Sequence, residues 1–257
     1  MTLDTMQWHE RVTLRYSKDD FRRKSLVELA RRHVTGKRVL EMRCLTGHLA
    51  VDLAAEGFEV TALDGYAEAV EMTNQLAASR GLARPIAQLW DLTGLVARVG
   101  ENRFDTVFCL DVLNHVPDDQ ATMPEIAKVL VPGGRLILTV PAAPFMLGLR
   151  DRTLGHLRRY TKQSITELLE RHGLRVQLVR YWNFSALPAY FVIEKILRKP
   201  LPDGVRYGRG KAVGSWPNRL LGWWYLAVEN RLWFPCGLSF FIVAEKPRGV
   251  SPDGHSR

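Results

Sequence analysis

Polar residues with clear chemical potential follow the apolar runs in the first half of the chain. Residues 41–48 read EMRCLTGH, and Asp64 and Asp91 follow the next two apolar runs. A carboxylate at the place of Asp64, after the second strand of such a pattern, accepts hydrogen bonds from ribose hydroxyls. A glycine such as Gly47 lets the backbone turn tightly and leaves no Cβ in the way of a ligand. These residue types predict a site for a ligand that carries a ribose.

A second group of polar residues is rich in histidine and arginine. His115 follows the fourth apolar run, and residues 155–161 read GHLRRYT. Imidazole titrates near neutral pH and can act as a general base, while adjacent arginines can bind an anion. Alternatively, His115 is a structural residue or lines the pocket without taking part in catalysis. The arginines could likewise hold loops in place through hydrogen bonds to carboxylate and carbonyl groups. The candidates are His115, His156 and Tyr160 as catalytic residues, and Asn114, Arg158 and Arg159 as substrate-binding residues.

Short apolar runs alternate with helical patterns and must position these residues. The alternation predicts an α/β fold: a Rossmann-like, doubly wound, mostly parallel seven-stranded sheet. Ligands of such sheets bind at the carboxyl ends of the strands. We expect strands at 38–42, 59–63, 85–89, 104–110, 135–140, 175–182 and 239–244, and helices at 21–33, 46–56, 67–80, 120–130 and 164–172.

Composition divides the chain into a core and flanking segments. Aromatic, proline and basic residues concentrate in 183–232, where 190–197 and 220–232 are typical of mostly apolar or amphipathic helices. We expect these helices to cap the strand ends, although a dimer interface would need the same composition. The predicted divisions are an N-terminal helical region at 1–36, the Rossmann-like core at 37–182, a C-terminal helical cap insertion at 183–236, a final core strand at 237–246 and a disordered tail at 247–257.

Composition also narrows the classes of function. The 257 residues carry a net charge of +9 and three cysteines without a CxxC pair, so we expect neither a disulfide framework nor a metal site. Residues 1–20 lack the apolar stretch of a signal peptide, and no apolar run is long enough to span a membrane, which favours a cytoplasmic location. The basic excess could attract an acidic substrate or an anionic membrane surface. No RNA- or DNA-binding signature accompanies it, so a nucleic-acid partner is not expected.

Residues 36–246 resemble class I S-adenosylmethionine-dependent methyltransferases. Residues 41–47 resemble their motif I, an acid followed by G-x-G-x-G, with Arg43 and Leu45 at two of the glycine positions. The helix–turn–strand segment 129–138 and the GHxRRYT-like segment also match a methyltransferase type 11/12-like subgroup. The resemblance implies S-adenosylmethionine as cofactor and S-adenosylhomocysteine as product. The implied cofactor-binding residues are Glu41, Arg43, Leu45, Gly47, Asp64, Gly65, Tyr66, Asp91, Leu92 and Leu110.

The altered glycine loop leaves three interpretations open. The loop could still bind S-adenosylmethionine, with Arg43 pairing the carboxylate; it could accept another ligand; or it could be closed. We expect a methyltransferase acting on a small or lipid-like, possibly anionic acceptor. The alternatives are a cyclase, lyase or isomerase of the same fold, or a non-catalytic binding module. An oligomer and a peripheral membrane contact through the cap are both compatible with the composition. Asp64 could instead cap a helix, and Asp91 could instead be a turn residue.

Overall fold

A computed structural model of the chain describes residues 21–91, 93–198 and 216–248. Three expectations lie outside these residues: the structure of 1–20, the cofactor role of Leu92, and the tail beyond residue 248. Within the described part of the chain, no helix has both the length and the apolar character needed to cross a bilayer.

The expected seven-stranded, mostly parallel sheet is confirmed. Its order is β3-β2-β1-β4-β5-β7-β6, with β7 antiparallel to both of its neighbours. Parallel neighbours from β3 to β5 bring the carboxyl ends of these strands to one edge. The strands are β1 (Arg38–Met42), β2 (Glu59–Asp64), β3 (Ala87–Leu89), β4 (Phe104–Leu110), β5 (Leu130–Pro141), β6 (Arg175–Trp182) and β7 (Ser239–Glu245).

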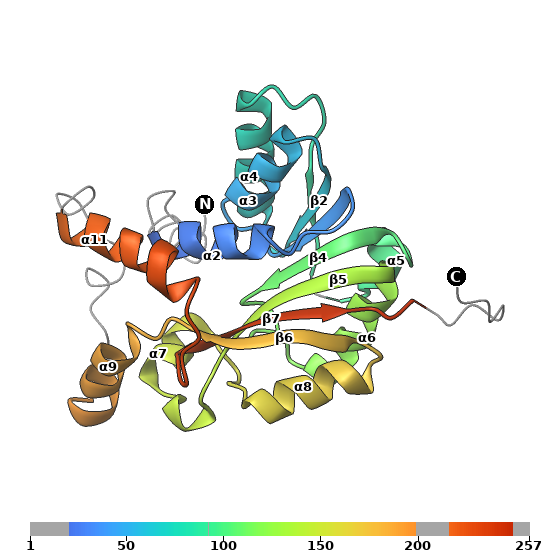
Figure 1. The fold of residues 1–257 in the computed structure, drawn as a ribbon. Coiled ribbons are helices and arrows are strands. Elements are labelled where there is room, and N and C mark those ends of the chain that lie inside the picture. The colour runs from blue at the N-terminus through green and yellow to red at the C-terminus, as the bar shows by residue number, and fades with distance from the viewer. Residues whose placement is uncertain (1–20, 92, 199–215, 249–257) are drawn as a thin grey trace, which may run out of the picture.

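Helices cover both faces of the sheet (Figure 1). One apolar cluster joins α2, α3 and η4 to β1, β4, β5 and β7, while a larger one joins α5, α6 and α8 to the opposite face. β4 is buried on both sides, which explains its continuous apolar sequence. The core helices are α2 (Phe21–Arg31), α3 (His48–Ala55), α4 (Ala67–Ser79), α5 (Leu95–Val99), α6 (Asp119–Val129) and α8 (Lys162–Arg171).

Short helices form a cap at the edge of the sheet where β4 ends (Figure 1). They are η1 (Pro144–Met146), α7 (Leu149–Leu154), α9 (Leu187–Tyr190), η2 (Phe191–Ile196), α11 (Trp216–Trp224) and η4 (Tyr225–Glu229). The two helical stretches expected in the cap are present but begin earlier than predicted.

The buried side chain of Arg180 in β6 fastens the cap to the sheet. It donates hydrogen bonds to the carbonyl oxygens of Glu229 at 2.5 Å, Asn230 at 3.0 Å and Leu232 at 2.7 Å. Trp182 donates from Nε1 to the Asn230 side chain at 3.2 Å. These bonds satisfy carbonyl groups at the end of η4 and fix the cap over the strand ends.

Candidate active site

The loop between β1 and α3 keeps a glycine-type backbone although two of its three glycine positions are occupied by other residues. Arg43, Leu45 and Gly47 have φ angles of 62°, 55° and 70°. At Gly47 a side chain is also sterically excluded, because a Cβ there would lie 2.4 Å from Oγ1 of Thr73. The left-handed conformation costs a non-glycine residue about 1–2 kcal/mol, so surrounding contacts must hold Arg43 and Leu45 in place.

Asp64 supplies part of that restraint. Its Oδ2 accepts a hydrogen bond from the Leu45 N–H at 2.8 Å, and its Oδ1 accepts one from the Tyr66 N–H at 3.1 Å. The carboxyl group is fully buried, and burial raises its pKa. Tyr66, not Asp64, is the N-cap of α4. In this structure Asp64 therefore ties the β1 loop to the β2 turn and does not line either cavity described below.

The first cavity, of about 110 Å³, opens between this loop, α2 and the end of β4. It gathers four of the expected cofactor residues: Glu41, Arg43, Leu45 and Leu110. Arg43 also donates a long hydrogen bond, 3.4 Å, to the Asp111 carbonyl oxygen. These four residues, which the sequence assigned to the cofactor, therefore lie around the same cavity.

Glu41 is the most unusual group in the first cavity. Its side chain is buried, and Oε2 has no hydrogen-bond partner among the described residues. Burial raises its pKa to about 8, against an opposing effect of the Arg23 charge. A buried carboxyl group without a partner favours a ligand that brings a hydrogen-bond donor or a positive charge.

The remaining expected cofactor residues lie at the ends of β2 and β3. Asp91 is exposed, and its Oδ1 accepts hydrogen bonds from the N–H of Thr93 at 3.1 Å and from its hydroxyl at 2.7 Å. These bonds lower the pKa of Asp91 and give it the geometry of a turn residue. Gly65, Tyr66 and Asp91 do not line the two described cavities.

A second cavity, of about 70 Å³, adjoins the first. Its wall includes Arg150, His156, Arg159 and Tyr190, which come from α7, the segment after it, and α9. The two cavities share Arg22, Asp111, Asn183 and Ser239. Sequence reasoning missed these shared residues. Asp111 directly follows β4, so the strand-end rule could have found it, whereas the others come from α2, the cap and β7.

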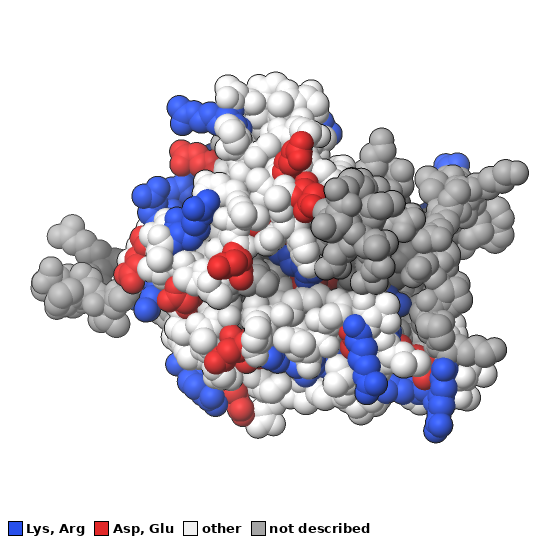
Figure 2. Space-filling model, turned by 180° about the vertical axis from the view of Figure 1, so that it is seen from behind, with Lys and Arg blue, Asp and Glu red and all other residues white. Residues whose placement is uncertain are grey.

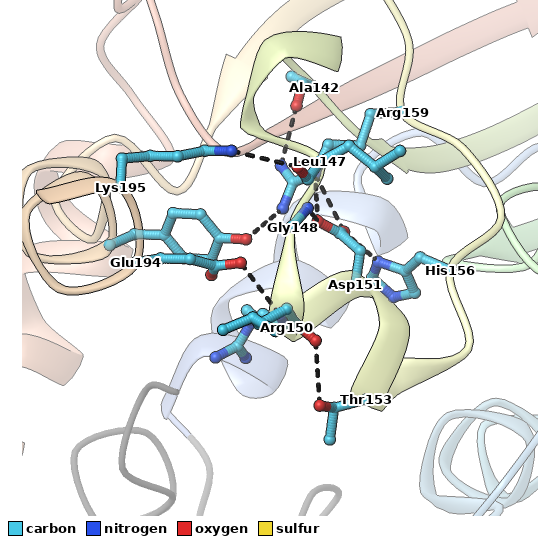
Figure 3. A network of polar contacts seen from close by, with 12 residues as sticks. Ala142, Leu147, Gly148, Arg150, Asp151, Thr153, His156, Arg159, Glu194 and Lys195 are labelled. Atoms are coloured by element: carbon cyan, nitrogen blue, oxygen red, sulfur yellow. Dashed lines mark hydrogen bonds and ion pairs between the residues drawn. The ribbon is translucent and has the colours of Figure 1, made fainter. Parts of the chain in front are cut away.

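Arg159 braces the cap instead of presenting a free cationic group. It donates from Nε to both oxygens of Asp151 at 3.0 and 2.9 Å, from Nη1 to the Ala142 carbonyl at 3.0 Å, and from Nη2 to the Tyr190 hydroxyl at 2.7 Å (Figure 3). Its side chain is 4% exposed. Arg159 reaches the second cavity, but these contacts account for its position.

Arg158 and Tyr160 do not line either of the two described cavities. Arg158 donates to the carbonyl oxygens of Val116 at 2.7 Å and Pro117 at 2.5 Å. The buried Tyr160 donates its hydroxyl hydrogen to Asp119 at 2.7 Å, and burial together with this bond raises its pKa. Both side chains join the segment after α7 to the start of α6 and the residues before it, and the substrate-binding role of Arg158 and the catalytic role of Tyr160 stay predictions.

His156 retains a place in the site, whereas His115 and Asn114 lie behind it. Nδ1 of His156 is 2.9 Å from Oδ1 of the buried Asp151 (Figure 3), and its ring meets the His115 ring edge-on at 4.9 Å. Asn114 is fully buried, and its carbonyl accepts the Leu157 N–H at 2.7 Å. Neither His115 nor Asn114 lines the described cavities. Asn114 is therefore a buried residue whose substrate-binding role stays a prediction.

Comparison with known proteins places this geometry in a family. Residues 14–179 match the model of a methyltransferase domain family. A ubiquinone biosynthesis O-methyltransferase of Pectobacterium carotovorum is 35% identical over 169 residues, which are 61% of this chain and 70% of that protein. A similar protein of Proteus mirabilis is 33% identical over 104 residues, 40% of this chain and 42% of its own length.

Solved structures with little sequence identity share the fold. The [4+2]-cyclase SpnF has a TM-score of 0.58 at 23% identity, covering 87% of this chain and 80% of its own. Geranyl diphosphate C-methyltransferase of Streptomyces coelicolor, solved with Mg²⁺, geranyl diphosphate and S-adenosylhomocysteine, has a TM-score of 0.59 at 10% identity, covering 88% and 79%.

The residues of the first cavity fit the amino-acid end of S-adenosylmethionine. The unpartnered carboxyl oxygen of Glu41 suits a ligand ammonium group, and the Arg43 guanidinium suits a carboxylate. The loop also keeps the backbone conformation that three glycines would give it. With the family match over residues 14–179, this chain is a member of the methyltransferase domain family and a methyltransferase that uses S-adenosylmethionine as its cofactor.

Proposed function

We propose that the protein transfers a methyl group to a small or lipid-like acceptor that carries a negatively charged group. The observation that carries this proposal is the pair of adjoining cavities at the carboxyl ends of the central strands. The first is lined by Glu41 and Arg43 and would hold the methyl donor. The second, which meets it at Asp111 and Asn183, would hold the acceptor.

The acceptor class follows from the wall of the second cavity. Arg22 and Arg150 contribute positive charge, while Leu154, Ala186 and Leu238 contribute apolar surface. Such a mixture favours an amphipathic molecule with an anionic group. The relatives named for ubiquinone biosynthesis and the neighbour solved with geranyl diphosphate support a lipid-like acceptor.

Because methyl transfer uses an already activated donor, the protein mainly has to bring donor and acceptor together. Isothermal titration with S-adenosylmethionine and S-adenosylhomocysteine tests the first cavity, and we expect micromolar dissociation constants. A mass-spectrometric screen of anionic phenols and isoprenoids for a gain of one methyl group tests the second. Absence of binding at millimolar cofactor would contradict the proposal.

One observation favours a second candidate function, an enzyme of this fold that does not transfer methyl. Arg43 and Leu45 replace glycines in the loop, and Leu45 is only 5% exposed, so its side chain occupies space beside the first cavity. The cyclase SpnF has the same fold. Cofactor binding without S-adenosylhomocysteine formation, in the presence of an acceptor that is converted, would favour this candidate.

The cap surface supports a peripheral contact with an anionic membrane. Among the described cap residues, the acidic Asp151, Glu194 and Glu229 are buried, whereas the basic Arg152, Arg198, Arg219 and Arg231 are exposed. In Figure 2, basic side chains project far into solvent at the end that carries α7 and α9. The exposed apolar residues of the described cap include Phe145, Leu147, Leu149, Phe191, Val192, Ile196, Leu197, Leu220, Leu221, Trp223, Leu226, Leu232 and Trp233.

Exposed apolar groups combined with basic charge are typical of interfacial segments that bind anionic lipids. We expect co-sedimentation with phosphatidylglycerol vesicles and little with phosphatidylcholine vesicles. Trp223→Ser with Trp233→Ser should weaken the binding at least threefold, and Leu89→Ser, an exposed apolar residue of β3, is the matched control. Equal binding to both vesicle types, or to neither, would contradict a membrane contact.

A further inference from the structure

We propose that His156 is the general base of the acceptor site, that Asp151 fixes its tautomer, and that the methylated atom is therefore a hydroxyl oxygen. This inference rests on the proposed methyl transfer and names the acceptor group. It assigns separate tasks to residues of one short segment: Asp151, His156 and Arg159.

Asp151 is held in one orientation by contacts from three sides. Its carboxylate accepts hydrogen bonds from the Gly148 N–H at 3.0 Å, from Arg159 Nε at 2.9 and 3.0 Å, and contacts His156 Nδ1 at 2.9 Å. Burial raises its pKa, but the bonds from His156 and Arg159 outweigh burial, and the net shift is downward. Asp151 is therefore ionised near neutral pH and can only accept, so Nδ1 of His156 must carry the proton.

Arg159 also acts on His156 through Asp151. Its guanidinium forms an ion pair with the Asp151 carboxylate at 2.9 Å and so holds that carboxylate in the orientation that meets Nδ1 of His156. A neutral imidazole that donates from Nδ1 has its lone pair on Nε2. Asp151, held by Arg159, thus selects the Nδ1-protonated tautomer of His156.

The Nε2 atom of His156 is placed for that task. The side chain is 9% exposed, and Nε2 is buried without a hydrogen-bond partner among the described residues. His156 lines the second cavity, next to the shared residue Asp111. An unpartnered buried acceptor is costly, and its residue belongs to the wall of the second cavity, which points to a bound acceptor molecule whose hydroxyl donates to Nε2.

This geometry selects the chemistry of the acceptor. A carboxylate is already ionised and needs no base, whereas a phenol or alcohol hydroxyl must lose its proton as the new bond forms. The acceptor O–H bond breaks and its proton moves to Nε2. An oxygen lone pair forms the new O–CH₃ bond, and the electrons of the broken sulfur–methyl bond remain on sulfur. Positive charge from Arg22 and Arg150 in the wall of the same cavity stabilises the developing oxyanion.

Other ionisable groups near His156 could produce a similar pH dependence and have to be separated from it. They are Arg150 and Asp151 of α7, Arg159 after α7, His115 and Asp111 after β4, Arg22 of α2 and Tyr190 of α9. Asp111 is the competing base, because it stands where the two cavities meet.

The first test needs no acceptor and no turnover. Long-range ¹⁵N–¹H NMR of the ¹⁵N-histidine-labelled protein reports the tautomer of each neutral imidazole. We expect one histidine with protonated Nδ1 and bare Nε2 whose signals disappear in His156→Gln or, should that variant fail to fold, in His156→Asn. If His156 instead carries its proton on Nε2, or is charged at pH 7.5, the proposal is overturned.

The second test uses the hydroxyl-bearing acceptor that the methylation screen identifies. His156→Gln should lower kcat about 100-fold or more, leave KM within threefold, and abolish the acidic limb of the pH–rate profile. His172→Gln, at the end of α8 and away from both cavities, is the matched control. Loss of the acidic limb in Asp111→Asn, with the limb retained in His156→Gln, would assign the base to Asp111 and overturn the proposal. Failure to find any methylated product would count against the proposed function, while the NMR result still decides the tautomer.

Discussion

The cofactor loop and the GHLRRYT segment differ in how their sequences relate to their structures. Residues 41–47 have lost two of three glycines, yet Arg43 and Leu45 keep left-handed backbone angles. Residues 155–161 have two arginines suited to an anion, yet both arginines bond protein groups. A left-handed backbone conformation can thus be kept by residues other than glycine. An arginine that could bind an anion can instead form all of its hydrogen bonds with groups of the protein.

The largest expected effect concerns Arg159. Arg159→Met keeps the length of the side chain but leaves the buried Asp151 without its counter-ion, so we expect a loss of about 3–5 kcal/mol in unfolding free energy. Urea denaturation measures this loss. Arg152→Met, an exposed arginine of α7, is the control and should change stability little. If Arg159→Met keeps its stability but binds the acceptor weakly, Arg159 is a binding residue. That result would contradict the conclusion that its guanidinium is used within the protein.

The next effect is a pH dependence that Glu41 imposes on stability. Its folded pKa of about 8 lies above the usual value, so the folded state holds a proton that the unfolded state releases. The contribution of Glu41 to the free energy of unfolding should therefore be most favourable below pH 4.5. It should become less favourable as the pH rises toward 8. Glu41→Gln should remove this fall, which amounts to about 3 kcal/mol between pH 5.5 and 8.5.

Urea titrations at pH 5.5 and 8.5 compare the two proteins, with the exposed Glu59→Gln as control. Cofactor affinity should rise over the same pH interval in the original protein, because an ionised Glu41 attracts the ligand ammonium. An unchanged pH slope in Glu41→Gln would mean that Glu41 is ionised in the folded state.

Gly47 separates backbone strain from steric exclusion within the cofactor loop. Gly47→Ala combines a φ of 70° with overlap against Thr73, and we expect a loss of about 2 kcal/mol. Gly57 has a φ of 85° and no atom within 4 Å of an added Cβ, so Gly57→Ala measures the strain alone. Thermal and urea unfolding of both variants should show the larger loss at position 47; equal losses would remove Thr73 from the explanation.

The smallest expected effect restores glycine where the loop lacks it. Leu45→Gly relieves one left-handed residue and clears side-chain volume from the first cavity, while the Arg43 guanidinium stays in place for the ligand carboxylate, so cofactor affinity should rise roughly tenfold. Calorimetric titration measures this, with Asn102→Gly, an exposed residue at φ 50°, as the control for relief of strain alone. Weaker binding in Leu45→Gly would show that the Leu45 side chain itself contributes to cofactor binding.

Sequence periodicity was sufficient for the fold because burial of a parallel sheet imposes local patterns. Mostly apolar runs such as β4 predicted seven strands at nearly the observed positions. Glycines near the helix ends marked the boundaries between the elements. Short elements were missed. α5 and α7 have five and six residues, fewer than periodicity can identify, and tertiary contacts stabilise them.

The sequence by itself determined the sheet, the loop after β1 and the grouping of Glu41, Arg43, Leu45 and Leu110 at one strand edge. These follow from strand ends, which are local properties of the chain. The tertiary structure decided what each polar group does: Asp64 secures a loop, Arg159 neutralises Asp151, and Asp111 joins two cavities. Hydrogen-bond partners far apart in the sequence, as between Arg180 and Leu232, arise only when the cap folds over the sheet, because donors are satisfied by the nearest acceptor in space.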